Sequence, residues 1–241
     1  MTIIHRLPGA LVGPEVANLP TLSALMLPSV GVSSYGYRWR AESLDQGIGT
    51  DVTSWATVAG LNPLTVPASR TAPKLRASGA RRYVEFDGVN NVLQSAATSL
   101  TGQRTIAIVA KTTGAGGTQQ DLFSMADNIR PGISRNSAGN TALFTPGSAS
   151  RQYAGDLSTW TFVAATFQLS DAILYYGANA TPSVATGVTG DALTSLRLAL
   201  LNGTAPGAVQ IAEVVTWPGV LTPTQIGQVR TALTTAQAGL L

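Results

Sequence analysis

Cysteine is absent from this sequence of 241 residues, and histidine occurs once, as His5. Disulfide frameworks, cysteine-based zinc sites and thiol catalysis are therefore excluded, and a metal site built from several histidines is impossible. A Ser-His-Asp triad would depend on a residue close to the amino terminus, so we do not expect one. A catalytic site would have to use other side chains, of which the carboxylates are the first to examine.

Charge is also scarce. Asp, Glu, Lys and Arg make up 11% of the residues, against about 25% in ordinary soluble domains. Yet no apolar run approaches the roughly 20 residues of a membrane helix, so membrane insertion is not expected. Exposed apolar patches are typical of interfaces, and we therefore expect part of the surface to be buried in an assembly, a homo-oligomer included. The alternative is a rigid β protein, rich in Thr, Ser, Ala and Gly, that is soluble on its own.

The charge balance gives no sign of a nucleic-acid partner. Fifteen basic and twelve acidic residues leave a net charge of +3. The densest basic segment, residues 70–82, has no aromatic residues interleaved through Arg70–Arg76, so it predicts a solvated loop and strand face rather than a stacking platform. Met1–Arg6 is not followed by an apolar signal core, and we expect a protein made and used without Sec-type export.

Residues 1–34 differ from the rest of the chain. Four prolines interrupt any helix or central strand in this segment, at positions 8, 14, 20 and 28. A solvated tail would be polar or charged, whereas this one carries an apolar group. That group consists of Leu19, Leu22, Leu25, Met26 and Leu27. We predict an extended N-terminal arm that lies on its own domain or on a neighbouring subunit.

From about residue 35 onward, short β runs alternate with clusters of Gly, Ser, Asn and Pro. The candidate strands are Tyr37–Ala41, Arg82–Phe86, Arg104–Lys111, Asp121–Met125, Arg130–Ser134, Thr141–Thr145, Thr159–Phe167, Ala172–Tyr176, Leu193–Leu201 and Ala208–Trp217. Many short strands with turn signals between them predict an all-β sandwich or jelly roll of two antiparallel sheets, here over residues 35–241.

One helix stands out near the carboxyl end. Thr222 is a plausible N-cap, Pro223 suits the first helical position, and Gln225 can close a capping box. One apolar stripe follows, made by Ile226, Val229 and Leu233. The pattern predicts a C-terminal helix over about residues 223–236, packed on the sandwich.

The run from Arg82 to Gly88 is the clearest strand-and-turn signal. Val84 and Phe86 fall on one face of the strand, and Glu85 and Asp87 fall on the other. Asp87-Gly88 is turn chemistry, because Gly adopts positive φ freely and Asp can bond its own backbone. Val84 and Phe86 are therefore expected in the core.

The order of several such landmarks resembles the concanavalin A-like lectin/glucanase superfamily, in its laminin-G-like branch. The strongest are a V-x-F-D-G strand, a W-x-x-V-A-x-T-F strand and an L-T-x-x-Q-I helix start. The landmarks are Tyr37–Ala41, Val52–Trp55, Gly60, Pro73, Val84–Gly88, Trp160–Phe167, Ile173–Gly177, Ile211–Val214 and Leu221–Ile226. The resemblance spans about residues 35–236 and implies a jelly-roll sandwich of two antiparallel sheets.

Two carboxylates raise the question of hydrolysis. Glu85 and Asp87 have Cα atoms about 6.6–6.8 Å apart on one strand face, and glycosidases use carboxylate pairs roughly 5–10 Å apart. Glucanases of the resembling superfamily carry a strand signature E-x-D-x-x-E. The third position in this sequence is Asn90, and Gly88 ends the strand before it. We therefore expect no enzyme, with Asp87 as a turn residue and Glu85 as a solvated strand position; a glycoside hydrolase remains the remote alternative.

Neither a metal nor an aromatic platform is expected. Calcium occurs in the resembling superfamily, and loop aspartates could supply oxygen ligands, but the sequence has no dense Asp/Asn run. These aspartates are Asp45, Asp51, Asp121, Asp127 and Asp156. We expect no cofactor, with a loop-bound calcium ion as the alternative. The four tryptophans, Trp39, Trp55, Trp160 and Trp217, lie at core positions of the resembling family and are predicted to be core.

Together these features favour a non-enzymatic structural protein of a virus particle: a capsid decoration, spike or tail-associated subunit of a tailed bacteriophage, assembled in the bacterial cytoplasm. Its partners would be other virion proteins and itself. Laminin-G-like domains also appear in phage virion proteins, which is what the resemblance adds. The alternative is a carbohydrate-binding module for host surface glycans, which predicts a sheet face with exposed aromatic residues or a loop-bound calcium ion.

Overall fold

A computed structural model describes residues 36–58, 62–96, 103–114, 118–124, 132–144, 151–153, 155–168, 171–178, 181–186, 195–200 and 206–241. The predicted arm over residues 1–34, with Leu19, Leu22, Leu25, Met26 and Leu27, lies outside these residues, as does His5. Its docking surface and the domain boundary beside it remain predictions.

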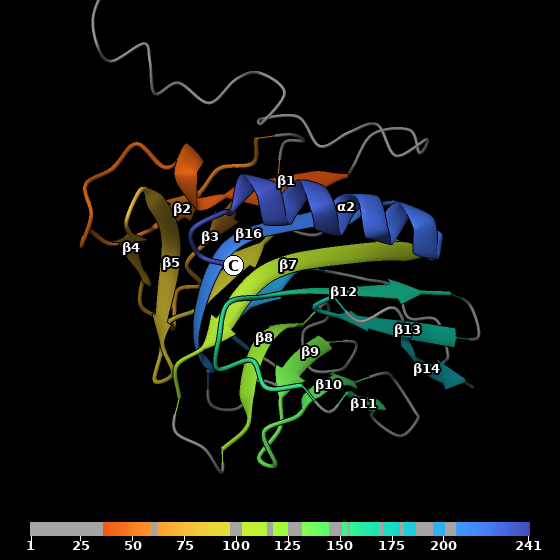
Figure 1. Cartoon of the computed structure of the whole chain (residues 1–241). Coiled ribbons are helices and arrows are strands. Elements are labelled where there is room, and N and C mark those ends of the chain that lie inside the picture. The colour runs from red at the N-terminus through yellow and green to blue at the C-terminus, as the bar shows by residue number, and fades with distance from the viewer. Residues whose placement is uncertain are drawn as a thin grey trace, which may run out of the picture.

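The described chain forms two antiparallel sheets that face each other (Figure 1). The first, called the β7 sheet, has the spatial order β14 (Ser183–Thr186), β13 (Asp171–Tyr176), β12 (Thr161–Phe167), β7 (Arg104–Thr112), β16 (Ala208–Trp217), β5 (Arg81–Asp87) and β4 (Lys74–Ser78), with β1 (Tyr37–Arg40) also paired to β16. The second, called the β8 sheet, has the order β11 (Arg151–Tyr153), β10 (Thr141–Phe144), β9 (Gly132–Arg135), β8 (Gln120–Ser124), β15 (Arg197–Leu198), β6 (Leu93–Ser95), β3 (Leu64–Thr65) and β2 (Ser54–Trp55). The predicted all-β jelly-roll sandwich is confirmed.

The core lies between the two sheets and follows the alternation of the strands. Val84 and Phe86 of β5 are at most 1% exposed and point into it, as predicted. Trp39 and Trp55 are fully buried in the same core. Their indole N–H groups donate to backbone carbonyls, so burial leaves no polar atom of these rings without a partner.

Two strand predictions need correction. Residues 74–78, which lie within the basic segment predicted as a solvated loop and strand face and were not among the candidate strands, form β4, and each of them pairs with a residue of β5. The segment from Leu193 to Leu201 was predicted as one long strand, but only Arg197–Leu198 is strand among its described residues. Ala199 has a φ of 62°, a left-handed conformation that ends regular pairing.

A single described α-helix, α2 (Pro223–Ala236), packs on the outer side of the β7 sheet, with the bounds that the capping pattern predicts. Thr222 Oγ1 accepts the Gln225 N–H at 3.3 Å, and the Gln225 side chain accepts the Thr222 N–H at 2.8 Å. Its predicted stripe is buried against outward-facing residues of the strands, among them Phe162 and Trp217. Figure 1 shows α2 lying over β16, β7 and β12, with β4 and β5 beyond its carboxyl end.

A buried ion pair ties β1 and the end of α2 to β16. Arg38 Nη2 lies 2.6 Å from Glu213 Oε1, with side chains 1% and 0% exposed. Gln237 Nε2 donates to Glu213 Oε2 at 2.9 Å, just after the last helical residue. Glu213 follows an irregularity in the β16–β7 register after Ile211. This contact fixes the carboxyl end of α2 to β16.

The short 3₁₀ helix η2 (Ala41–Ser43) follows β1 directly. No helix among the described residues is both long and apolar enough to cross a membrane.

Candidate functional site

The loop after β5 is a closed hydrogen-bonded turn. Asp87 Oδ1 accepts the backbone N–H groups of Val89 at 2.8 Å, and of Asn90 and Asn91 at 3.1 Å each. Asn91 Oδ1 in turn accepts the Asp87 N–H at 3.0 Å. Gly88 adopts a φ of +74°, which glycine reaches without strain. The predicted role of Asp87-Gly88 as a structural turn is confirmed.

These contacts lower the pKa of Asp87 and make it unsuited to acid catalysis. Partial burial would raise the pKa of Asp87, but the three backbone N–H groups that donate to its carboxylate outweigh that effect and hold its pKa below the ordinary value. A glycosidase acid needs the opposite, a raised pKa that keeps it protonated near neutral pH. Asp87 is therefore suited to fixing a turn and not to donating a proton.

Both oxygens of Glu85 are also engaged. Arg76 Nε donates to Oε2 at 2.7 Å, and Gln210 Nε2 donates to Oε1 at 2.8 Å. The side chain is 31% exposed, so Glu85, expected as a solvated strand position, is only partly solvated and is held by two donors. Asn90, the third position of the glucanase-like pattern, has its side chain turned to Arg70 Nη1 at 3.3 Å. Asn90 is not among the residues that line the pocket beside Glu85 and Asp87.

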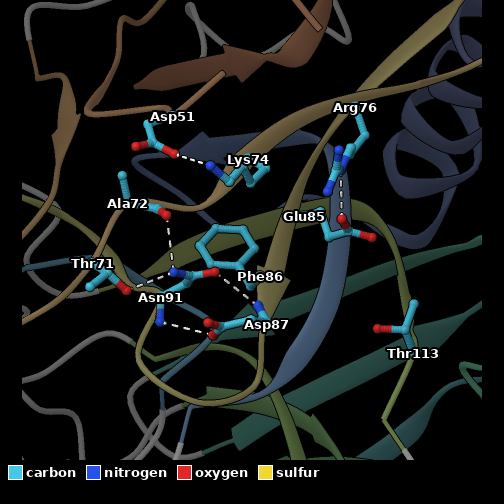
Figure 2. A pocket seen from close by; sticks show the side chains of 10 residues that line it. All are labelled: Asp51, Thr71, Ala72, Lys74, Arg76, Glu85, Phe86, Asp87, Asn91 and Thr113. Carbon is cyan, nitrogen blue, oxygen red and sulfur yellow. Dashed lines mark hydrogen bonds and ion pairs between the residues drawn. The ribbon is translucent and has the colours of Figure 1, made fainter. Parts of the chain in front are cut away.

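Glu85 and Asp87 line a pocket of about 530 Å³ at the β4–β5 edge of the β7 sheet. Figure 2 shows how its side chains pair: Lys74 points to Asp51, with Nζ and Oδ1 2.6 Å apart, and Arg76 points to Glu85. The Asn91 amide donates to Thr71 Oγ1 at 2.8 Å and to the Ala72 carbonyl at 3.0 Å. The pocket is thus a preformed array of alternating donors and acceptors.

A row of side chains continues from this pocket across the sheet. The strand register pairs Lys74 with Glu85, Glu85 with Gln210, and Gln210 with Lys111. Thr161 pairs with Ala110, so Trp160 lies next to Lys111, and Lys111 Nζ is 5.5 Å from the centroid of the Trp160 ring. We call Lys74, Glu85, Gln210, Lys111 and Trp160 the cross-strand row. It spans roughly 19 Å, since neighbouring strands lie about 4.8 Å apart.

Gln210, in the middle of the row, has an unfilled acceptor. The residue is 7% exposed, and its Nε2 is used by Glu85. Its Oε1 is buried and accepts no hydrogen bond from the described residues. A buried amide oxygen without a donor is costly, so this atom is suited to accept from a buried water.

Beyond Trp160, the row meets a second hollow of about 510 Å³ between α2 and the β12–β13 strands. We call it the aromatic groove; its lining includes Trp160, Tyr176, Arg230, Thr231 and Thr234. The Tyr176 hydroxyl donates to the Asp156 carbonyl at 2.7 Å, which fixes the ring. Arg230 Nη1 donates to the Gly177 carbonyl at 3.4 Å, which leaves most of its fork unused by that contact.

Trp160 departs from its predicted place. Trp39, Trp55 and Trp217 are at most 1% exposed, as expected. Trp160 is only half-buried, and its ring packs edge to face against Tyr83, with centroids 5.4 Å apart, on the outer side of the sheet. Sequence reasoning also missed Lys111 and Gln210 as site residues. One sequence signal could have found them: each is a long polar side chain near the end of an apolar strand, at a position that alternation directs outward.

The aspartates considered for calcium do not gather. Asp51 pairs with Lys74, and Asp156 Oδ1 lies 2.8 Å from Arg135 Nε. Asp127 lies outside the described residues. Within the part of the chain that the structure describes, no three Asp, Glu, His or Cys side chains form a group that could hold a metal ion.

Comparison with known proteins supports the fold. No protein-family model matches the sequence, and no curated protein matches it. Among solved structures, the chain resembles Trypanosoma rangeli sialidase with a TM-score of 0.62 and 12% identity, over 88% of this chain and 34% of the sialidase. It resembles the binding domain of Paraclostridial Mosquitocidal Protein 1 with a TM-score of 0.56 and 13% identity, over 78% of this chain and 51% of that domain structure. It also resembles the Botulinum neurotoxin serotype G binding domain with a TM-score of 0.57 and 11% identity, over 77% of this chain and 52% of that structure.

The chain therefore spans about a third to a half of these structures. At such low identities the likeness establishes the β-sandwich fold, in agreement with a concanavalin A-like jelly roll, and nothing finer.

Proposed function

We propose that this chain is a non-enzymatic carbohydrate-binding module whose ligand lies along the cross-strand row. The observation that carries the proposal is the row itself: paired donors and acceptors on a sheet face, ending at a half-buried indole. A glycan needs both donors and acceptors for its hydroxyls and an apolar surface for its C–H faces. A length of roughly 19 Å suits a short oligosaccharide rather than a single sugar.

The structural neighbours support a binding role, although they share only the fold with this chain. They include a sialidase solved in complex with sialic acid and the binding domains of two toxins. The resemblance to laminin-G-like domains adds the same expectation for residues 35–236.

The state of the carboxylates supports a non-enzymatic role. The lowered pKa of Asp87 and the two donors held by Glu85 leave this pair without a proton donor and without a free nucleophile. If any glycan hydrolysis is detected, replacing Glu85→Gln should leave its rate unchanged. A rate that falls with this substitution would restore the hydrolase hypothesis.

A glycan array with the purified chain tests binding directly. We expect retention of defined oligosaccharides, unchanged by a chelator, and a loss of roughly tenfold or more in affinity for Trp160→Ala. Trp160→Phe is the matched control and should keep most of the affinity, because it preserves an aromatic face. Gln210→Leu, which keeps side-chain volume but removes the amide, should also weaken binding. A folded wild-type chain that retains no glycan would refute the proposal.

As a second proposal, we infer that this module is a structural subunit of a bacteriophage particle. It rests on the sequence: a charged fraction of 11%, and the apolar, proline-broken residues 1–34. An arm that buries Leu22 and Met26 on a neighbouring subunit would incorporate the chain into a virion and leave the cross-strand row facing outward. Deletion of residues 1–30 should abolish incorporation into particles while glycan binding persists; unchanged incorporation would refute the role of the arm.

A further inference from the structure

We propose that the glycan bound on this face carries a carboxylate, held beside Trp160 by Lys111 and Arg230. This inference rests on the proposed glycan-binding function and narrows its ligand class to acidic sugars.

The first observation is the pairing of cations along the face. Lys74 is neutralised by Asp51, and Arg76 is neutralised by Glu85. Lys111 and Arg230 differ, because neither has a carboxylate within 4.0 Å among the described residues. These two unneutralised cations lie at the aromatic end of the row.

The second observation is that Trp160 contacts Lys111 and shares a groove with Arg230. Lys111 comes from β7 and places its Nζ over the Trp160 ring at 5.5 Å. Arg230 comes from α2 and lines the aromatic groove together with Trp160. The described lining of this groove contains no Asp or Glu side chain. Leu241, the last residue of the sequence, also lines the groove. Its main-chain carboxylate is not in an ion pair with Arg230.

The third observation is that the two ends of the face differ in charge. At the far end of the row, the pocket lining holds three acids, Asp51, Glu85 and Asp87, and two bases, Lys74 and Arg76, for a net charge of −1. At the Trp160 end, the charged side chains, Lys111 and Arg230, are both positive. An acidic sugar should therefore bind at the Trp160 end, with neutral residues of the same glycan extending toward the pocket.

The chemistry of the two cations favours a carboxylate. The guanidinium of Arg230 offers a planar fork that matches a carboxylate in bidentate fashion, and the Lys111 ammonium adds a point charge. The Trp160 ring would pack on the sugar face beside the carboxylate, which lowers the local exposure to water and strengthens both ionic contacts.

Calorimetry with tetragalacturonic acid and its fully methyl-esterified form tests the inference, because the two share one backbone and differ in charge. We expect the acid to bind at least roughly tenfold more tightly, with an affinity that falls as salt rises. Lys111→Gln and Arg230→Gln should each reduce this preference about five- to tenfold, because each should weaken binding of the acid more than binding of the ester. Lys74→Gln, at the paired end, is the control and should keep the preference. Thermal melts verify that each variant is folded.

Other outcomes decide against the inference. Equal affinity for acid and ester, or equal loss of both in Lys111→Gln, would overturn it. A sulfated oligosaccharide that binds more tightly than every carboxylated one would overturn the choice of carboxylate. A polysialic acid fragment in place of the galacturonide distinguishes the two sources of a sugar carboxylate, and binding of either supports the class. If the array shows neutral glycans alone, the inference fails while the proposed function stands; if it shows none, both fail.

Discussion

Glu85 and Gln210 are joined by a hydrogen bond of 2.8 Å although 125 positions separate them in the sequence. They are register partners in β5 and β16, so the bond runs directly across the sheet. Because Arg76 holds the other oxygen of Glu85, a carboxylate that resembles a catalytic group becomes one member of a binding row. The same bond leaves Gln210 Oε1 without a donor at the centre of that row.

The turn at Gly88 should tolerate no side chain. A Cβ added there would lie 2.8 Å from Ala208 Cβ and 2.9 Å from its backbone nitrogen, at a φ of +74°. We expect Gly88→Ala to lower the free energy of unfolding in urea. Gly79→Ala is the matched control, because Gly79 has a φ of +58° but open space around its Cβ. The Gly88 variant should lose about 1–3 kcal/mol more than the control; equal losses would show that the Ala208 contact relaxes freely.

The stability that Asp87 provides should depend on pH. Its folded pKa lies below the ordinary value of 3.8, so the unfolded chain takes up the proton first as the pH falls. The contribution is therefore complete above 3.8 and is lost as the pH falls through the folded pKa. At neutral pH, Asp87→Asn should cost about 1 kcal/mol in urea unfolding. Well below 3.8 the gap between wild type and variant should close; a constant gap would contradict the assignment.

The buried pair Glu213–Arg38 should be one of the most sensitive points of the fold. Replacing Glu213→Ala removes the buried carboxylate that faces the Arg38 guanidinium, and we expect a loss of about 3–5 kcal/mol of unfolding free energy. Lys74→Ala is the control, since its pair with Asp51 is exposed, with side chains 47% and 57% accessible, and should cost less than about 1 kcal/mol. Joint replacement of Glu213 and Arg38 by apolar residues should recover part of the loss.

Helix α2 offers a stabilising substitution. Gly227 lies in the helix interior, and a Cβ added there meets nothing within 4 Å. Gly227→Ala should raise the free energy of unfolding by roughly 0.5–1 kcal/mol, because alanine loses less backbone entropy in a helix. Thr222→Ala should act in the opposite direction by about 1 kcal/mol through loss of the N-cap. Chemical denaturation measures both, and a destabilised Gly227→Ala variant would show that the face is not open.

The elements that could be predicted from sequence are those with local causes. The bounds of α2 follow from the Thr222–Gln225 capping box and one apolar stripe, and the Asp87-Gly88 turn follows from the chemistry of two adjacent residues. The buried positions of Val84 and Phe86 follow from the period of a strand. β4 escaped prediction because its basic residues look solvated in isolation, whereas pairing with β5 places Arg76 beside Glu85.

The candidate site could not be predicted in the same way. Lys74, Glu85, Gln210 and Lys111 come from four strands, and only the register brings them into one row. A shift of one residue in any strand would turn its member of the row into the core. Trp160 was predicted to be core because it lies at a core position of the resembling family, whereas in the structure it packs half-buried on the outer cluster beneath α2.

The sequence by itself determined the all-β class, the cap of the helix and the absence of thiol and multi-histidine chemistry, because these depend on residue type and short-range spacing. Only the tertiary structure decided that Glu85 is held by Gln210 and Arg76, and that Lys111 and Arg230 lie unneutralised beside Trp160. Those relationships depend on strand register and on where a helix packs, and both are set by burial of apolar surface across the whole sandwich.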